Sequence, residues 1–502
     1  MRVVKNPQMQ FGEVAISEIK FDPKSRDDIP QILKGLQFIY TNTVTREEIF
    51  KLLEKNISPK TNKNNGRPGM DLWKIFVMGV LRLDLNLDFD RLHNEVNYHS
   101  QIRQMLGHGF FDKEGNYELQ TIKDNVSLLT PELLDEINQV IVKAGHAIIK
   151  KKENDPLRGR CDSFVIETNV HFPTDINLLF DAMRKVITLS ADLCVPYGIS
   201  DWRQYVHNVK QLKRLMRTAQ NKKRARAKSE EQKKKLDALI IGAHQEYIDV
   251  AQKYLNKACH TLNTIEIQGF ASISDALLAE SIRIFINHGI RQINQIERRV
   301  ICGEMIPHNE KVFSLFQPHT EWVMKGKAGV PVELGVKVCV MEDQYQFILH
   351  HMVMEKKTDD EVAVPMVDET KKRFTSFSTC SFDKGFHSQN NQKLLSEKLD
   401  VVALKRKGRL SKQAEATEHS EEFLKARHKH SAIESAINAL EVHGLNMCPD
   451  HGINGFKRYV ALAVVARNIH RIGAILKNRE QKSEERRREK YLHRNGTFKL
   501  AA

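Results

Sequence analysis

Residues 160–170, RCDSFVIETNV, form the first segment of the chain with the composition of a β-strand. Its β-branched and aromatic residues are typical of a buried strand, and HFPTD at 171–175 ends the pattern. Side chains alternate along a strand, so Asp162 and Glu167 lie on opposite faces. Asp162 is the candidate functional acid because it stands at the strand's polar start, although either acid alone is more often an ordinary surface residue.

Further strands follow much later in the chain. ELGVKVCVM at 333–341 and QYQFILHHMVM at 344–354 predict a β-hairpin. Beyond the hairpin we expect a helix over 359–372, a strand over 377–383, a helix over 388–399 and a strand over 401–404. Strands interleaved with helices are typical of an α/β or α+β sheet domain. The first strand is therefore separated from the rest of its sheet by a long insertion.

The segments before and after the first strand have helical periodicity. Residues 61–150 predict a helix-turn-helix-like DNA-binding domain, with a plain helical bundle as the even alternative. Residues 177–316 predict long helices with a basic face. That face either is solvated or binds the phosphates of a nucleic-acid backbone. The expected segments are an N-terminal arm (1–60), the helical domain (61–150), the first core strand (151–176), the helical basic insertion (177–316), the remainder of the core (317–476) and a charged tail (477–502).

Composition favours a polyanionic partner. The 502 residues include 78 Lys and Arg against 63 Asp and Glu, a formal net charge of +15. Such an excess attracts nucleic acid in a manner that weakens with salt. We expect a cytoplasmic protein without a membrane segment, because we find neither a run of eighteen apolar residues nor a signal-peptide core. The seven scattered cysteines lack a CxxC pair and favour neither disulfides nor structural zinc.

Two more acids stand where metal chemistry needs them. Asp383 closes a predicted strand and precedes Gly385, at a position where ligands gather in α/β sheets; the alternative is a turn aspartate. Glu434 borders the apolar seam of a predicted helix, with a salt-bridging glutamate as the alternative. Two Mg²⁺ or Mn²⁺ ions, about 4 Å apart, need hard oxygen ligands for phosphoryl transfer. Mutual repulsion should raise the pKa values of such carboxylates until the metals bind.

Four motifs resemble, in their order and their amino-acid sequence, those of the DDE transposases of bacterial insertion sequences, most nearly the ISNCY group. They are CDSFVIETNVHFPTDINLL, SLFQPHTEWVMKGKAGVPVELGVKV, FDKGFHSQNN and HSAIESAINALEVHGLNMCPDHGINGFKRYVALAVVARNIHRIG. The resemblance covers about residues 60–475 and implies an RNase H-like catalytic core, with Asp162, Asp383 and Glu434 as the catalytic and metal-binding triad. It also implies a dimer on double-stranded DNA, since two transposon ends are cut in concert.

Basic residues near these motifs are candidates for DNA contacts. Arg67 lies in a GRP turn that could enter a minor groove, although a plain turn and helix cap is the more frequent meaning. The other candidates are Lys325 and Lys327 of the KGK motif, the triplet Lys405, Arg406 and Lys407, and Arg427, Lys429 and His430. The last three would replace an arginine and a lysine that some related transposases carry around the catalytic glutamate, where this chain has His430 and Glu441.

The sequence thus predicts a transposase that cuts DNA at insertion-sequence ends by metal-dependent hydrolysis and joins the 3′ ends to target DNA by transesterification. Two alternatives stay open. One is a metal-dependent nuclease that does not join strands, and the other is a domesticated DNA-binding protein without catalysis.

Overall fold

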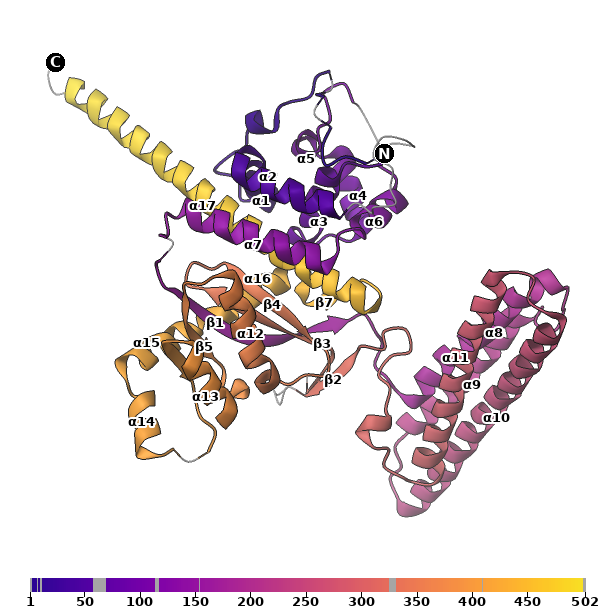
Figure 1. Ribbon diagram of the computed structural model, residues 1–502. Helices are drawn as coiled ribbons and strands as arrows, with labels where there is room; N and C mark the ends of the chain where they lie inside the picture. Colours follow the sequence, from indigo (N-terminus) through magenta and orange to yellow (C-terminus); the bar gives the residue numbers. More distant parts are fainter. Residues whose placement is uncertain are drawn as a thin grey trace. The chain divides into compact units, whose positions relative to one another are not determined.

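The computed structural model describes residues 2–6, 8–9, 11–56, 69–112, 117–152, 154–324, 331–408 and 410–499 of the chain. The chain divides into two compact units (Figure 1). The first comprises Met1–Asn169 and Val323–Ala502, and the second is Val170–Trp322. The six segments expected from the sequence are a finer division than this one, and their boundaries stay a prediction.

A mixed sheet organises the first unit (Figure 1). Its order is β2-β3-β1-β5-β6, with β4 paired to β3 and β7 paired to β1. Strands β1, β3 and β4 pair antiparallel, whereas β5, β6 and β7 continue the sheet in parallel pairs. The strands are β1 (Leu157–Thr168), β2 (Glu321–Met324), β3 (Val332–Asp343), β4 (Ile348–Met354), β5 (Phe377–Phe382), β6 (Val401–Leu404) and β7 (Met447–Cys448). The expectation of a mixed α/β sheet domain is confirmed.

The helices around the sheet share its hydrophobic core. Those before β1 are α1 (Asp28–Thr41), α2 (Thr43–Lys55), α3 (Leu72–Asp84), α4 (Phe89–Tyr98), α5 (Ser100–Met105), α6 (Leu119–Val126) and α7 (Pro131–Ile148). Those after β4 are α12 (Asp359–Arg373), α13 (Gln389–Lys398), α14 (Lys412–Glu418), α15 (Glu421–His430), α16 (Ala432–Leu440) and α17 (Gly452–Lys499). One continuous cluster of buried side chains joins the early helices, the sheet and α17.

Helix α17 carries an apolar window that is long enough, by length and composition, to cross a membrane. That window is 72% buried inside the protein, where α17 packs against α1, α3 and α7. Its apolar residues therefore serve as core. After them the helix continues (Figure 1), and the sequence of this continuation is highly charged.

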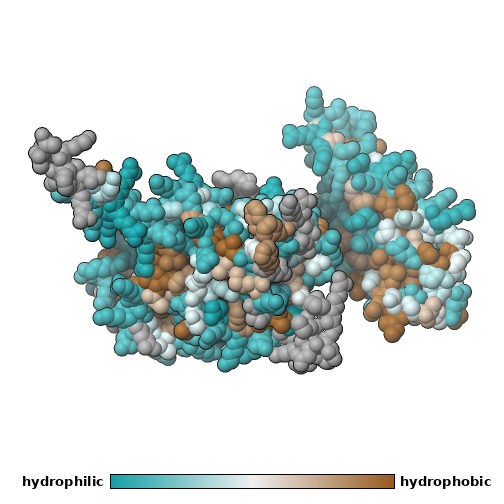
Figure 2. All heavy atoms as spheres, turned by 90° about the horizontal axis from the view of Figure 1, so that it is seen from above, coloured by the Kyte–Doolittle hydropathy of each residue, from teal (hydrophilic) through white to brown (hydrophobic). Residues whose placement is uncertain are grey.

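The second unit is helical and has a core of its own. Its long helices are α8 (Asp175–Cys194), α9 (Tyr205–Arg224), α10 (Glu230–Gln268) and α11 (Ile273–Ile296) (Figure 1). Apolar side chains at helical spacing meet between them, including Trp202 and Tyr247, which are fully buried. Hydrophobic side chains also reach the surface of this unit, among hydrophilic ones (Figure 2).

Two glycines set the close approach of α1 to α17. A Cβ at Gly473 would lie 2.0 Å from the backbone oxygen of Gln31, and a Cβ at Gly35 would lie 2.3 Å from that of Ile469. Neither backbone oxygen can move aside without shifting its helix. The two helices can therefore pack at this separation only where the side chain is a hydrogen atom.

We expect Gly473→Ala to lower the free energy of unfolding by about 2 kcal/mol, because the added methyl group forces the helices apart. Urea denaturation followed by circular dichroism measures the change. Gly242→Ala is the matched control, since its helical position faces open space, and it should be neutral or stabilising by about 0.5 kcal/mol. Equal stability of Gly473→Ala and wild type would show that the helices do not pack this closely.

Candidate functional site

The register of β1 and β5 brings Asp162 and Asp383 together. Cys161 pairs with Phe382 in this parallel ladder, so the next residues of the two strands are Asp162 and Asp383. Neighbouring strands lie about 4.8 Å apart, and paired residues project to the same face. Strand β5 ends at Phe382, and Asp383 opens the short 3₁₀ turn that follows. The two carboxylates therefore leave adjacent backbone positions where the pairing stops.

One detail of the sequence prediction is wrong. The sequence predicts Asp162 at the polar start of its strand, but β1 begins at Leu157 and Asp162 lies in its interior. The preceding residues extend the strand because they pair with β3 on one side and with β5 on the other. Neighbouring strands, which local polarity does not reveal, thus decide where β1 begins.

Glu434 joins the two aspartates from a helix. It lies in the first turn of α16, which packs against β1 through a buried face that includes Ile433 and Ala436. Glu434 itself is exposed, and its charge acts on Asp162. Strand pairing and helix packing thus bring together three acids that are far apart in the chain.

Burial is the main reason why the pKa of Asp162 is raised to about 6. The backbone N–H of Ser163 donates to Asp162 Oδ1 at 2.7 Å and opposes the rise. The negative charges of Asp383, Asp359 and Glu434 then raise the pKa further. Among the described residues, no Lys, Arg or His forms an ion pair with the three predicted triad acids. A partly buried carboxylate with further negative charges beside it is a site that a cation would stabilise.

Asp359 is a fourth acid that the sequence analysis missed. It is the first residue of α12 and accepts hydrogen bonds from Ser163 Oγ at 2.6 Å and Lys337 Nζ at 3.1 Å. A Cβ at Gly385 would lie 3.1 Å from Asp359 Oδ2, so Asp359 also contacts the segment that follows Asp383. The sequence TDDE at 358–361 signalled only a helix start, whose capping box the structure contains.

Basic side chains lie near these acids. Lys407 Nζ donates to the backbone oxygen of Gly385 at 3.1 Å, which places it beside the turn after Asp383. Lys405 and Arg427 line one cavity of about 460 Å³. Arg406 and Lys407 line another of about 450 Å³. These are surface cations at the parallel end of the sheet, and their predicted role in DNA contacts remains a prediction.

His430 lies at the end of α15, close to the acids. Its Nδ1 is 3.0 Å from Ser381 Oγ in β5. Burial lowers the pKa of His430, while the charges of Asp383 and Glu434 oppose that shift. Lys429 is exposed on the same helix, and its backbone oxygen accepts from Arg160 at 3.4 Å. Arg67, Lys325 and Lys327 lie outside the described residues.

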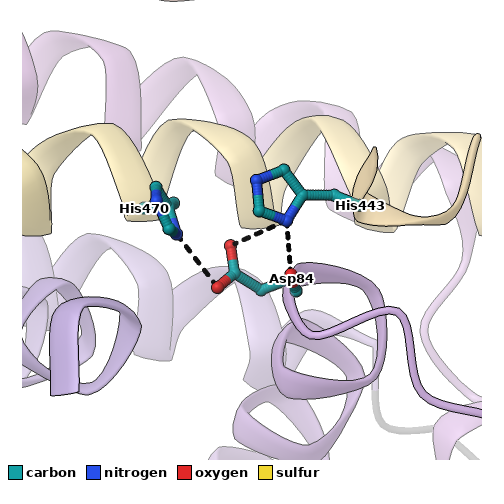
Figure 3. Close-up of side chains that lie close together, drawn as sticks. All are labelled: Asp84, His443 and His470. Atoms are coloured by element: carbon teal, nitrogen blue, oxygen red, sulfur yellow. Dashed lines mark hydrogen bonds and ion pairs between the residues drawn. The ribbon is translucent and has the colours of Figure 1, made fainter. Parts of the chain in front are cut away.

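A separate group of titratable side chains lies deep in the first unit (Figure 3). Asp84, His443 and His470 are buried, and one possible ligand atom from each lies within 4.8 Å of the others. By residue type and distance, such a group could hold a metal ion. The sequence analysis missed it, because its members come from α3, from the segment after α16 and from α17.

The hydrogen bonds of this group favour a structural role. His470 Nε2 lies 2.5 Å from the Gln31 amide nitrogen, which can only donate, so the ring proton belongs on Nδ1. From there it is donated to Asp84 Oδ2 at 3.0 Å. His443 Nδ1 contacts the backbone oxygen of Asp84, which can only accept. Both nitrogens that face Asp84 therefore act as donors, and these contacts tie α3 to α17 and to the segment after α16 (Figure 3). Gln31 extends the network to α1.

No protein-family profile, curated protein or solved structure matches the chain. The candidate site is therefore defined by the geometry of the chain itself. Carboxylate oxygens are hard ligands that suit Mg²⁺ or Mn²⁺. The four carboxylates come from one strand, two helices and one turn: Asp162 from β1, Asp359 from α12, Glu434 from α16 and Asp383 from the turn after β5. Such a set can hold divalent cations where the pairing of β1 with β5 ends.

Asp162→Asn should raise the free energy of unfolding in EDTA at about pH 7.5, by on the order of 1 kcal/mol, because it removes a desolvated charge. Folding raises this pKa from 3.8 to about 6. The cost of the charge is therefore absent below the lower value, grows between the two and is complete above the upper one. The advantage of the variant should vanish near pH 4 and shrink when Mg²⁺ stabilises the wild type.

Urea denaturation at each pH, with and without Mg²⁺, measures this difference. Glu397→Gln, which changes an exposed acid on α13, is the control and should differ little from wild type under all conditions. A variant that is less stable than wild type throughout the pH range would contradict the description of Asp162.

Asp84→Asn should lower the free energy of unfolding by about 2 kcal/mol, because it weakens the buried hydrogen bond to His470. The exposed Asp90→Asn on α4 is the control, expected to change stability by less than about 0.5 kcal/mol. Adding EDTA or Zn²⁺ should leave the melting temperature of both proteins unchanged. If Zn²⁺ raised the melting temperature of the wild type but not that of Asp84→Asn, the group would instead be a metal site.

Proposed function

We propose that the chain is a metal-dependent DNA transposase of the DDE type. The observation that carries this proposal is that Asp162 and Asp383 directly follow the last β1–β5 pair, Cys161 and Phe382, with Glu434 close enough to raise the pKa of Asp162. The net charge of +15 supports DNA as the polyanion that binds near these acids.

The sheet supports an RNase H-like core as part of the same proposal. Three strands pair antiparallel as β4-β3-β1, and two more continue in parallel as β5-β6. The long helical unit enters the chain directly after β1. The candidate acids therefore belong to segments on both sides of this insertion, and the core must assemble from distant parts of the chain.

The residues divide into those for the cations and those for the DNA. Two Mg²⁺ ions would activate an attacking oxygen and stabilise the leaving one. Asp162, Asp383 and Glu434 would hold those ions, and Ser163 N–H fixes the Asp162 carboxylate through its bond to Oδ1. Asp359 would help to orient that pair of residues, because it accepts from Ser163 Oγ.

Lysine and arginine side chains near the acids would hold the sugar–phosphate backbone. Lys405 and Lys407 follow β6. Because β5 and β6 are parallel, these lysines lie at the same end of the sheet as Asp383, which follows β5. Such contacts position DNA without selecting sequence. The proposed reaction is hydrolysis at the ends of the element, followed by attack of the freed 3′-hydroxyl on target DNA. A dimer would hold the two ends.

Asp162→Asn, Asp383→Asn and Glu434→Gln should each reduce Mg²⁺-dependent cleavage by at least ~10²-fold, because each removes a ligand charge at the reacting phosphate. The substrate is a radiolabelled duplex taken from the DNA that borders the gene, and denaturing gels resolve cut and joined products. Binding of the same duplex in EDTA should be retained.

Glu397→Gln is the control and should cleave like wild type. Wild-type cleavage by any of the three variants would remove that residue from the triad. Cleavage by wild type without joined products would support the nuclease alternative. Tight DNA binding with no cleavage by wild type would support a binding protein that does not catalyse.

A further inference from the structure

A cavity of about 300 Å³ lies within the second unit, and the catalytic acids take no part in it. Its walls come from the start of α8, the end of α9, the segment after α11 and Trp322, the last residue of this unit. Four rings and three cationic side chains contribute to its lining: Phe172, His308, Phe313, Trp322, Lys223, Arg299 and Lys311.

The rings form a connected set. Trp322 contacts Phe172 edge to face, with ring centroids 5.6 Å apart, and contacts Phe313 with centroids 5.7 Å apart. His308 continues the set through Phe313 at 5.3 Å. Phe172 is 59% exposed, although a phenylalanine gains free energy on burial. The cavity therefore offers aromatic surface that is still open to a planar partner.

The cations give the cavity an excess of positive charge. Arg299 pairs with Asp175 at 2.8 Å, and both side chains line the wall. Burial raises the pKa of Asp175, while the charges of Arg299, Lys223 and Lys311 oppose that rise. Three cations thus surround a single carboxylate. An anionic ligand would balance the charge that remains.

Aromatic surface together with excess cations fits a ligand that has both a planar ring and a phosphate. Bases stack on aromatic side chains, and lysine and arginine bind the attached phosphates. A base inside a duplex is stacked on its neighbours and cannot enter such a cavity, whereas an unpaired base can.

We infer that this cavity binds an unpaired nucleotide of a DNA strand, with the base against Trp322 and Phe172 and the phosphate near Lys223 and Lys311. DNA as the source of that nucleotide rests on the proposed function. The cavity uses residues of the second unit alone, so its binding can be measured without catalysis.

Trp322 supplies its own reporter. Of the three tryptophans, Trp73 and Trp202 are buried, with 0% and 1% exposure, whereas Trp322 is partly exposed. Stacking of a base on Trp322 should quench its emission. Full-length protein in EDTA is titrated with a single-stranded oligothymidylate of fifteen nucleotides, and both tryptophan emission and the anisotropy of a labelled strand are followed.

Wild type should show quenching that saturates with the anisotropy change. Trp322→Ala should weaken binding about tenfold, whereas Trp322→Phe should bind nearly as wild type but without quenching. Phe172→Ala should also weaken binding. Phe270→Ala, which removes an exposed ring after α10, is the matched control and should leave affinity unchanged. Lys311→Ala should reduce the slope of log Kd against log salt by about 0.7.

The inference is overturned if wild-type emission does not change on binding, or if Trp322→Ala and Phe172→Ala bind as tightly as Phe270→Ala. Thymidine monophosphate and oligouridylate are titrated in parallel. Equal affinity for the monophosphate would overturn a DNA strand as the ligand, as would tighter binding of the RNA. Loss of cleavage in the triad variants is scored separately, so failure of this inference leaves the proposed function standing, and the reverse also holds.

Discussion

The parallel pairing of β1 with β5 is the constraint on which the candidate site depends. A strand shifted by one residue turns every side chain to the opposite face, so only the observed register presents Asp162 beside Asp383. Gly159 helps to fix that register, because a Cβ there would lie 2.5 Å from the ring of Phe377 and 2.8 Å from Met341 Sδ. Packing of neighbouring side chains on both sides of β1 thus determines where the acids meet.

The same pairing gathers charge at a cost. Asp162 is partly buried next to other carboxylates, and its raised pKa reflects the added free-energy cost of ionising it in the folded protein. The hydrophobic core offsets this free-energy cost. It is large and continuous, and it extends from α1 through the sheet to α17. If these acids bind cations as proposed, a continuous core would hold them in place before an ion binds, as preorganised metal ligands require.

Local sequence predicted much of the sheet, because β-branched runs are a local signal, and it located Asp383 at the end of a strand. The hairpin of β3 and β4 and the alternation of α12, β5, α13 and β6 lie within a few residues of their expected places. Contacts between distant segments were missed. Asp359 was hidden in a helix-start motif, and Asp84 meets His470 across 386 positions of the chain. Phe172 and Trp322 likewise meet because the helical unit returns to where it began. Such proximities follow from tertiary packing and leave no periodic trace in the sequence.

The central claim is that Asp162, Asp383 and Glu434 jointly bind divalent cations. The most direct measurement is an anomalous difference map from crystals of the full chain soaked in Mn²⁺. The account predicts two peaks about 4 Å apart, each within about 2.0–2.6 Å of carboxylate oxygens from these residues. It would be contradicted by a map in which the three side chains are ordered and well separated, with Mn²⁺ bound elsewhere or not at all.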